Sequence, residues 1–392
     1  MESNTILYKP LGDVIELLTD YHANGAYEKL KENVTLLDKE NHAVMIRTTN
    51  FEANDFTNNL IYIDEHAYEF LKKSKVYASD LIMNKIANPG TVYFMPEISK
   101  PVSLGMNLFL IRINPKKANP YFIYAYLRKN EHYVKSFASG STTKTITKDD
   151  VRRLKIYTPP LAEQNKIAKV LSTWDQAISA TEKMLENSQQ QKKALMQQLL
   201  TGKKRLLDEN GVKFSGEWKD SHLVDIAKIS KGKALSSKDL EIGSYPVIAG
   251  GKTSPYTHSE YTHENVITVS ASGAYAGYVA FYPYKIWASD CSVVSNKIGS
   301  DINFIYHLLV SMQTIIYSLQ SGGAQPHIYP KDIEGLKILI PPLVEQKKIA
   351  SVLSLADQEI DTLQKKLDCL KQEKKALMQQ LLTGKKRVKV AA

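Results

Sequence analysis

Few residue groupings in this 392-residue sequence have the spacing that catalysis or ligand binding requires. The segment PVIAGGKT (246–253) ends like a phosphate-binding P-loop, but Pro246 replaces the first glycine and Pro255 interrupts the helix that should follow. Four histidines lack the spacing of metal ligands, and solvated or packed side chains are their ordinary interpretation: His258, His263, His307 and His327. The sequence therefore predicts neither a nucleotide site nor a metal site.

Catalytic signatures of enzymes that act on DNA are missing as well. An aminomethyltransferase carries an Asn-Pro-Pro-Tyr or Asp-Pro-Pro-Tyr motif, and Asn119-Pro120-Tyr121 is not one. We also find no cluster of acidic residues with a lysine, as in a nuclease. We therefore expect a non-catalytic chain that carries no cofactor of its own.

Loops that combine small and polar residues are the best candidates for a binding surface. Glycine lets the backbone approach a ligand closely, and Ser, Thr, Asn and Lys donate hydrogen bonds to phosphates or base edges. A plain turn is the more ordinary interpretation of any single loop. The candidates for DNA contact are Arg47, Thr48, Asn84, Lys85, Asn88, Asn107, Ser141, Thr142 and Lys144, and in the second half Lys252, Thr253, Ser272, Tyr275, Gln325 and His327.

Bulk composition narrows the class of protein without identifying a ligand. The chain is 43% hydrophobic and 23% charged, as in globular proteins, and no stretch approaches the roughly 20 apolar residues of a membrane span. Residues 1–10 lack the plan of a signal peptide, and Cys291 and Cys369 lie far apart, so we expect a cytoplasmic protein. The net charge is +10, yet residues 206–340 carry 11 basic and 13 acidic side chains, so charge alone does not mark them as DNA-binding.

An internal repeat decides the architecture. Residues 159–205 and 341–387 are related by an offset of 182 without a gap, and 31 of 47 positions are identical. Both copies end in KKALMQQLLTGKKR. In each copy a Pro-Pro pair suits the entry to a helix, and a glycine followed by Lys-Lys-Arg suits its end. Each copy is therefore predicted to be a long helix of roughly 60 Å.

Apolar residues repeat every seven positions in both helices, as in a coiled coil. Because the second helix can run back beside the first, we expect an antiparallel pair, with ordinary core helices as the alternative. The expected seam residues are Ile167, Leu171, Trp174, Ile178, Leu185, Leu195 and Leu199 in the first copy, and Ile349, Leu353, Ile360, Leu363, Leu367, Leu370, Leu377 and Leu381 in the second.

The segments before the two helices share their ends and differ in their middles. Phe122-Ile123-Tyr124 matches Phe304-Ile305-Tyr306 at the same offset, and LGDVIELL (11–18) resembles LVDIAKIS (223–230). Short β-type runs such as 264–282, followed by helical stretches, predict two α/β or α+β domains with mixed, mainly antiparallel sheets. The expected parts are a first domain (1–158), a first helix (159–205), a second domain (206–340), a second helix (341–387) and a tail (388–392), with pseudo-two-fold symmetry.

These motifs together resemble a known family. The twin PPLxEQxxIAxVLS…KKALMQQLLTGKKR helices, YPVIAGGKTSPY (245–256), SASGAYAGY (270–278) and GGAQPHIY (322–329) are similar to the specificity subunit of type I restriction–modification systems. AVMIRTTNFEANDF (43–56) and PVSLGMNLF (101–109) resemble a target recognition domain of another subtype. The resemblance covers essentially the whole chain.

The resemblance implies two target recognition domains that read a bipartite, asymmetric site in double-stranded DNA. It also implies two methyltransferase subunits as partners, which bind S-adenosylmethionine and methylate adenine N6, and motor-nuclease subunits where the system also cleaves. Helix length would then set the distance between the half-sites. An autonomous two-headed DNA-binding regulator and a coiled-coil scaffold are the alternatives.

One feature of the second domain sharpens the expected chemistry. Between Leu206 and Val388 the one arginine is Arg387, which lies beyond that domain. The commonest specific contact to guanine, a forked arginine, is therefore unavailable there. We expect Lys252, Ser272, Tyr275, Gln325 and His327 to read that half-site, aided by backbone amides.

Overall fold

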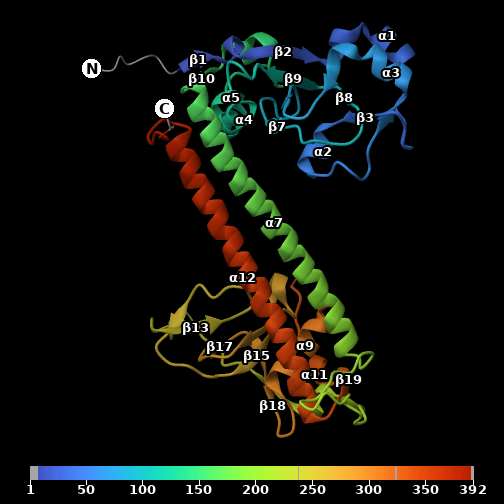
Figure 1. The fold of residues 1–392 in the computed structure, drawn as a ribbon. Helices are drawn as coiled ribbons and strands as arrows, with labels where there is room; N and C mark the ends of the chain where they lie inside the picture. The colour runs from blue at the N-terminus through green and yellow to red at the C-terminus, as the bar shows by residue number, and fades with distance from the viewer. Residues whose placement is uncertain (1–7, 237, 323–324, 390–392) are drawn as a thin grey trace. The chain divides into compact units, whose positions relative to one another are not determined.

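The chain forms two compact units. The computed structural model describes residues 8–236, 238–322 and 325–389. Unit 1 comprises Met1–Ala180 and Leu367–Ala392, and unit 2 comprises Thr181–Lys366. Each unit therefore contains one globular domain and one part of each long helix (Figure 1).

The globular domain of unit 1 contains two four-stranded sheets. One has the order β2-β9-β6-β7 and the other β4-β3-β8-β5. Only β3 and β8 run parallel among these paired strands. The strands are β2 (Ile15–Asp20), β3 (Ala43–Ile46), β4 (Tyr62–Ile63), β5 (Lys75–Val76), β6 (Leu81–Asn84), β7 (Val92–Phe94), β8 (Val102–Leu104) and β9 (Leu108–Ile113).

Unit 2 repeats this topology except that its second sheet has no counterpart of β5. Its sheets have the orders β12-β18-β15-β16 and β14-β13-β17, and β13 and β17 are its parallel pair. The strands are β12 (Ala227–Lys231), β13 (Tyr245–Ile248), β14 (Thr257–His258), β15 (Val266–Ser270), β16 (Val279–Tyr282), β17 (Trp287–Ala288) and β18 (Cys291–Asn296). The prediction of mixed, mainly antiparallel sheets is confirmed.

Short helices cover the sheets at matching positions. Asn119 caps α4 (Pro120–Lys129) by accepting the amide of Phe122 at 3.0 Å, and Asp301 caps α9 (Ile302–Ser311) by accepting that of Phe304 at 2.9 Å. The remaining helices are α1 (Tyr27–Asn33), α2 (Thr48–Glu52), α3 (Glu65–Phe70), α5 (Glu131–Lys135), α6 (Lys148–Arg153), α8 (Leu223–Ile226), α10 (Gln313–Ser318) and α11 (Pro330–Glu334), with 3-10 turns at Leu11–Asp13, Tyr21–Asn24, Lys72–Ser74 and Gly273–Tyr275.

A two-stranded ribbon joins the two ends of each domain. β1 (Tyr8–Pro10) pairs antiparallel with β10 (Lys155–Tyr157), and β11 (Lys219–His222) pairs antiparallel with β19 (Lys337–Ile340). The residues that follow β1 and β11 also make equivalent hydrogen bonds. Leu11 N donates to Leu154 O at 2.7 Å, and Leu223 N donates to Leu336 O at 3.0 Å. The similarity of the two segment openings in sequence thus reflects the same local structure.

The two long helices have equal lengths. α7 spans Leu161–Leu199 and α12 spans Leu343–Leu381, each with 39 residues. Each helix ends before a glycine with positive φ, Gly202 at 71° and Gly384 at 72°. Every expected seam residue in both helices is buried or half-buried. The two helices pack together within each unit.

Each unit completes its core with residues from both long helices. In unit 1 the buried core includes Ile167 and Leu171 from the start of α7, and Leu381 and Leu382 from the end of α12. In unit 2 it includes Leu199 and Leu200 from the end of α7, and Ile349, Ala350 and Leu353 from the start of α12. The pairing inside each unit is therefore antiparallel.

Ion pairs between helix starts and helix ends repeat in both units. In unit 1 the Arg387 guanidinium binds Glu163 through Nε at 2.9 Å and Nη2 at 2.7 Å. In unit 2 Arg205 binds Glu345 through Nε at 2.5 Å and Nη2 at 2.6 Å. Burial acts to raise the pKa of Glu163, but the Arg387 hydrogen bonds outweigh it and hold that pKa below its usual value.

A second pair of charges lies farther along the helices. Lys374 pairs with Asp175 in unit 1, and Lys192 pairs with Asp357 in unit 2. All four residues are related by the offset of 182, so the repeat preserves contacts as well as residue types. Among the described helices, none has the length and hydropathy needed to cross a membrane.

Candidate nucleic-acid interface

The candidate loops of unit 1 are hydrogen-bonded to one another. Thr48 Oγ1 donates to Asn84 Oδ1 at 3.1 Å, which ties the start of α2, just after β3, to the end of β6. Lys85 N donates to Asn107 O at 2.9 Å, and Ile146 N donates to Lys85 O at 3.1 Å. Four loops that lie far apart in the sequence therefore meet beside β6.

Asp20 holds two lysines at this place. Its Oδ2 accepts from Lys85 Nζ at 3.1 Å, and its Oδ1 accepts from Lys148 Nζ at 3.0 Å. Burial acts to raise the pKa of Asp20, but the hydrogen bonds from Lys148 and Lys85 outweigh it, so this pKa lies below its usual value. The carboxylate stays charged and fixes both ammonium groups, and each lysine side chain is about one-third exposed.

The rim of this cluster is exposed. Arg47 is exposed, and its Nη2 makes a long 3.4 Å contact with the carbonyl of Asn59. Asn88, Thr142 and Lys144 line a cavity of about 430 Å³, and Asn107 and Ser141 are exposed. Asn84 differs from the other candidates, because its side chain is buried and braces Thr48 from below the surface.

Unit 2 gathers its candidate loops in the same manner. Ala271 N donates to Asp290 O at 3.1 Å, and Ile328 N donates to Ala271 O at 2.9 Å. Gly273 N donates to Pro326 O at 3.1 Å, and Ser272 and His327 form a β-bridge. The loops that carry Ser272, Asp290 and His327 therefore lie against one another.

Side chains of unit 2 that face this cluster are polar and aromatic. Lys252 Nζ lies 5.4 Å from the ring centroids of both Tyr275 and Tyr278, within the range of cation–π attraction. Ser272 Oγ donates to Asp290 Oδ2. Gln325 and Thr253 are exposed, and the ring of His327 stacks on that of Tyr329 with centroids 6.1 Å apart.

The two clusters share a set of backbone hydrogen bonds. Lys85 in unit 1 corresponds to Ala271 in unit 2, since each donates its amide to one flanking loop and accepts from the next. By the same contacts, Asn107 corresponds to Asp290 and Ile146 to Ile328. Gly90 (φ 89°) and Gly277 (φ 86°) occupy the same turn, where the positive φ favours glycine. One backbone scaffold thus presents two different sets of side chains.

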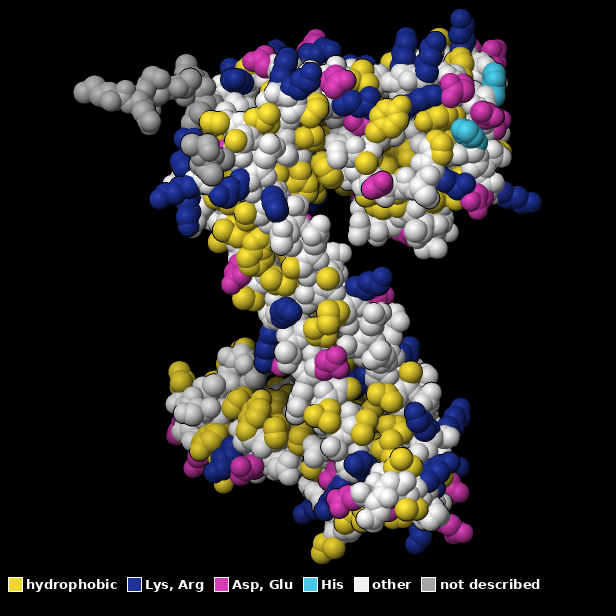
Figure 2. All heavy atoms as spheres, in the orientation of Figure 1, with side chains coloured by type: hydrophobic (Ala, Val, Ile, Leu, Met, Phe, Trp, Pro, Cys, Tyr) yellow, Lys and Arg dark blue, Asp and Glu magenta, His cyan; other side chains and the backbone are white. Residues whose placement is uncertain are grey.

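Charge is distributed unevenly over the candidate residues. Unit 1 offers Arg47, Lys85 and Lys144, whereas Lys252 is the one lysine or arginine among the unit 2 candidates. Figure 2 shows Lys and Arg side chains of unit 1 interspersed with acidic and hydrophobic ones on the visible face. Any DNA contact by these clusters therefore rests on individual side chains more than on a broad basic patch.

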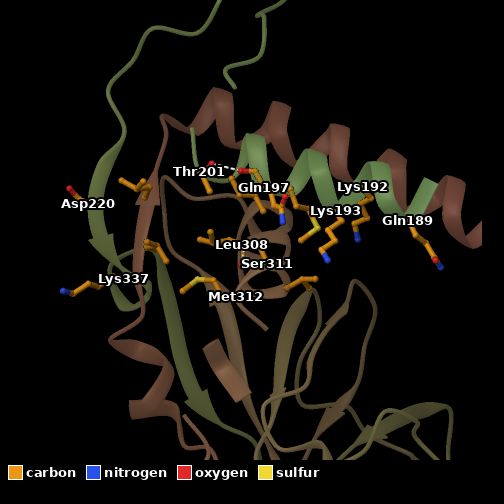
Figure 3. Close-up of a pocket in the computed structure, with 15 residues that line it drawn as sticks. Gln189, Lys192, Lys193, Gln197, Thr201, Asp220, Leu308, Ser311, Met312 and Lys337 are labelled. Carbon is orange, nitrogen blue, oxygen red and sulfur yellow. Dashed lines mark hydrogen bonds between the residues drawn. The ribbon is translucent and has the colours of Figure 1, made fainter. Parts of the chain in front are cut away.

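A second candidate surface lies along the end of α7 in unit 2. A cavity of about 760 Å³ is lined there by residues of α7 and the following turn: Gln189, Lys192, Lys193, Met196, Gln197, Leu200 and Thr201. Figure 3 shows Lys193 and Gln197 on the side of Leu308, Ser311 and Met312, with Asp220 and Lys337 at one end. Six of these seven residues belong to KKALMQQLLTGKKR, the segment that is identical in the two long helices, and Gln189 lies just before it.

The described residues give no sign of other chemistry. No group of three or more potential metal-ligating side chains lies close together in the described part of the chain. The P-loop-like segment 246–253 leads from β13 into a loop and not into a helix. His258 and His307 are buried, and His307 Nε2 lies 3.1 Å from Ser354 Oγ.

Sequence reasoning missed four residues of these clusters. Asp20 and Lys148 are 128 positions apart in the sequence, and no local pattern predicts their contact. Asp290 and Tyr278 belong to short β-rich segments in which nothing distinguishes them from turn and strand residues. Only the topology, by bringing β-strand ends together, places them beside the candidates.

Comparison with known proteins gives a consistent result. The model of the type I restriction modification DNA specificity domain matches residues 8–188 and 215–372. A candidate type I specificity subunit of Methanocaldococcus jannaschii, MjaX, is 31% identical over 356 residues, covering 84% of this chain and 83% of that protein. The MjaVIII specificity subunit of the same organism is 26% identical over 336 residues, with 77% and 78% covered.

A solved structure shows a similar fold. The S subunit of the type I restriction–modification system of M. genitalium matches with a TM-score of 0.70 and 18% sequence identity. The match covers 97% of this chain and 98% of that one. The arrangement of sheet-rich domains with long helices is thus shared well beyond the reach of sequence similarity.

Proposed function

Because the chain belongs to the type I restriction–modification DNA specificity family, it is a DNA specificity subunit, and we propose that units 1 and 2 each bind one half of a bipartite target. Specificity subunits are non-catalytic and work in a complex with other subunits. The equivalence of the two loop clusters carries the proposal, because one backbone scaffold with different side chains suits two different half-sites. The family assignment favours this function over an autonomous regulator or a scaffold.

Catalysis would then come from partner methyltransferase subunits. These would bind S-adenosylmethionine, which supplies the methyl group, and motor-nuclease subunits would join where the system cleaves. The role of this chain would be to hold the DNA so that an adenine in each half-site reaches a partner's active site. Its contributions would be binding and orientation.

The identical helix ends favour two equivalent docking surfaces for these partners. Burial at the seam explains why Lys192, Leu195 and Leu199 match their repeat copies. Lys193 and Gln197 are exposed, yet they too are identical to their copies, Lys375 and Gln379. Recognition of the same kind of partner by each copy would preserve such exposed residues.

The DNA-reading half of the proposal is tested by site choice. Complexes that carry Lys252→Ala or Gln325→Ala in unit 2 should methylate a changed second half-site and an unchanged first one. Mapping of methylated adenines across a genome measures both halves at once. Unchanged sites at unchanged rates would contradict the assignment of unit 2.

The docking half is tested by stoichiometry. Met196 lines the unit 2 cavity, and Met378 is its copy in unit 1. Either Met196→Asp or Met378→Asp should leave one bound methyltransferase subunit, and the double variant should leave none, as measured by native mass spectrometry. Val344→Asp controls for the added charge alone, since Val344 is 68% exposed and lies outside the identical segment, whereas Met196 and Met378 are half-buried against the cores. Two bound partners in the double variant would contradict the proposed surfaces.

A further inference from the structure

Asp290 has a fixed place in the loop cluster of unit 2. It lies between β17 and β18, and its carbonyl oxygen accepts from Ala271 N at 3.1 Å. Its side-chain Oδ2 accepts from Ser272 Oγ. Both its backbone and one carboxylate oxygen are therefore held by the loop that carries the candidates Ser272 and Tyr275.

The rest of this carboxylate is free to bind something else. Asp290 is half-buried, and within the described residues its one side-chain hydrogen bond is the one that Oδ2 accepts from Ser272. Gly250 lies beside it, and a Cβ there would stand 2.9 Å from Ser272 O and 3.4 Å from Asp290 Oδ2. Because glycine has no side chain, nothing from that position covers the carboxylate.

The equivalent residue of unit 1 has different chemistry. The carbonyl oxygen of Asn107 accepts a hydrogen bond from Lys85 N, just as that of Asp290 accepts one from Ala271 N, and Asn107 is exposed. An amide can both donate and accept, whereas a carboxylate can only accept. At this shared position the two units therefore offer different hydrogen-bonding groups.

A carboxylate in a DNA-binding site is repelled by the phosphates, and a hydrogen bond accepted from a base donor can offset that cost where no lysine or arginine pairs with it. In the major groove only adenine N6 and cytosine N4 present a donor, while guanine and thymine present acceptors at the corresponding edge. We propose that Asp290 is a specificity residue that accepts a hydrogen bond from the exocyclic amino group of an adenine or a cytosine in the half-site bound by unit 2. This inference rests on the proposed function.

Asp290→Asn is the sharpest test. The asparagine keeps the size of the side chain and an oxygen that accepts from Ser272, but it adds a donor. Binding and methylation by the complete complex would be measured on a DNA library randomised in the second half-site. Discrimination against guanine or thymine should fall at least about tenfold at one base pair, and the first half-site should stay unchanged.

Two further variants separate base reading from loop bracing. Ser272→Ala removes the bond to Asp290 but leaves the carboxylate, so it should lower the overall rate and retain the preference for adenine or cytosine. Asn107→Asp in unit 1 should add such a preference at one position of the first half-site.

The outcomes that overturn the inference are distinct from those that overturn the proposed function. If Asp290→Asn lowers methylation of all library sequences in equal proportion, Asp290 braces the loop and does not read a base. If Lys252→Ala and Gln325→Ala also leave the second half-site unchanged, unit 2 does not read that half-site through these loops.

Discussion

At the scale of single residues, the two units differ most where the same scaffold position carries different chemistry. Lys85 in unit 1 carries an ammonium group that Asp20 holds in place. Its counterpart in unit 2, Ala271, has only a methyl group, which cannot bind a phosphate. The DNA contacts of the two units should therefore differ in kind. The loop cluster of unit 1 has the fixed ammonium groups of Lys85 and Lys148, and that of unit 2 has Lys252 beside the rings of Tyr275 and Tyr278.

His307 illustrates such a difference in the interior of a unit. It is buried against α12 in unit 2, with Nδ1 3.7 Å from Asp357 Oδ2, and burial lowers its pKa to about 4. The repeat places Ala125 at the equivalent position of unit 1. Asp357 and Asp301 oppose this lowering and Lys192 adds to it, so the neutral imidazole is the form that unit 2 buries.

Acid should therefore weaken unit 2 through His307. An unfolded histidine binds a proton below about pH 6.5, and the folded one does so only near pH 4, so the unfolded state gains protons first. The free energy of unfolding should fall between pH 6.5 and pH 4, by up to about 3 kcal/mol from this group. Urea titrations of the wild type and of His307→Ala at pH 7, 5.5 and 4.5 measure the difference. Parallel losses in both proteins would contradict this role.

At the scale of elements, the buried carboxylates at the starts of the long helices depend on their arginine partners, and these partners differ in exposure. Glu345 is fully buried and also accepts from Trp218 Nε1 at 3.2 Å, while Arg205 is 18% exposed. In unit 1 the equivalent Arg387 is 53% exposed. Solvent therefore screens the unit 1 pair more than the unit 2 pair.

Removal of the two arginines should have unequal effects. Arg205→Met leaves a buried charge without its partner and should destabilise unit 2 by about 3 kcal/mol. Arg387→Met should cost unit 1 less, because water can approach Glu163 more easily. Thermal unfolding of each variant gives the comparison, and addition of Glu345→Gln to Arg205→Met should recover part of the loss. Equal losses in the two single variants would show that burial does not set the strength of these pairs.

The long helices are also the elements that sequence alone defines best. The heptad spacing, the prolines at the helix starts and the glycines after the helix ends are all local features of the sequence. The bounds of the helices can therefore be predicted without knowledge of the fold. The helices begin two residues after the first proline and end three residues before the glycine. Strand order was not readable, because β2 pairs with β9 and β12 with β18 across long stretches of chain.

The candidate site was only partly predictable for the same reason. Loops rich in glycine and polar residues are visible in the sequence, and they do meet in each unit. Asn84 is a polar residue in a loop-like stretch, as the other candidates are, but it is buried. Its burial depends on the packing around the end of β6, which the sequence does not show. Asp20 and Asp290 became candidates only through contacts with residues distant in sequence.

At the scale of the whole molecule, we expect helix length to set the separation of the two half-sites. Both helices run for 39 residues without a break, so removal of one heptad from each should preserve the seam. Deletion of residues 182–188 together with 361–367 removes about 10 Å of helix, or roughly three base pairs of DNA. Mapping of methylated adenines should show a spacer shorter by that amount. An unchanged spacer in an active complex would exclude helix length as the ruler.

The contribution of the end of α12 to the core of unit 1 has a consequence for biosynthesis. Ile167 and Leu171 leave the ribosome early, but Leu381, Leu382 and Arg387 complete their environment only when the chain is nearly finished. The ribosome adds about 5–20 residues per second, so part of the apolar surface of the first domain stays uncovered for roughly 10–40 s. Unit 2, which is continuous in sequence from Thr181 to Lys366, has no such delay. The first domain to be made is therefore the last to be finished.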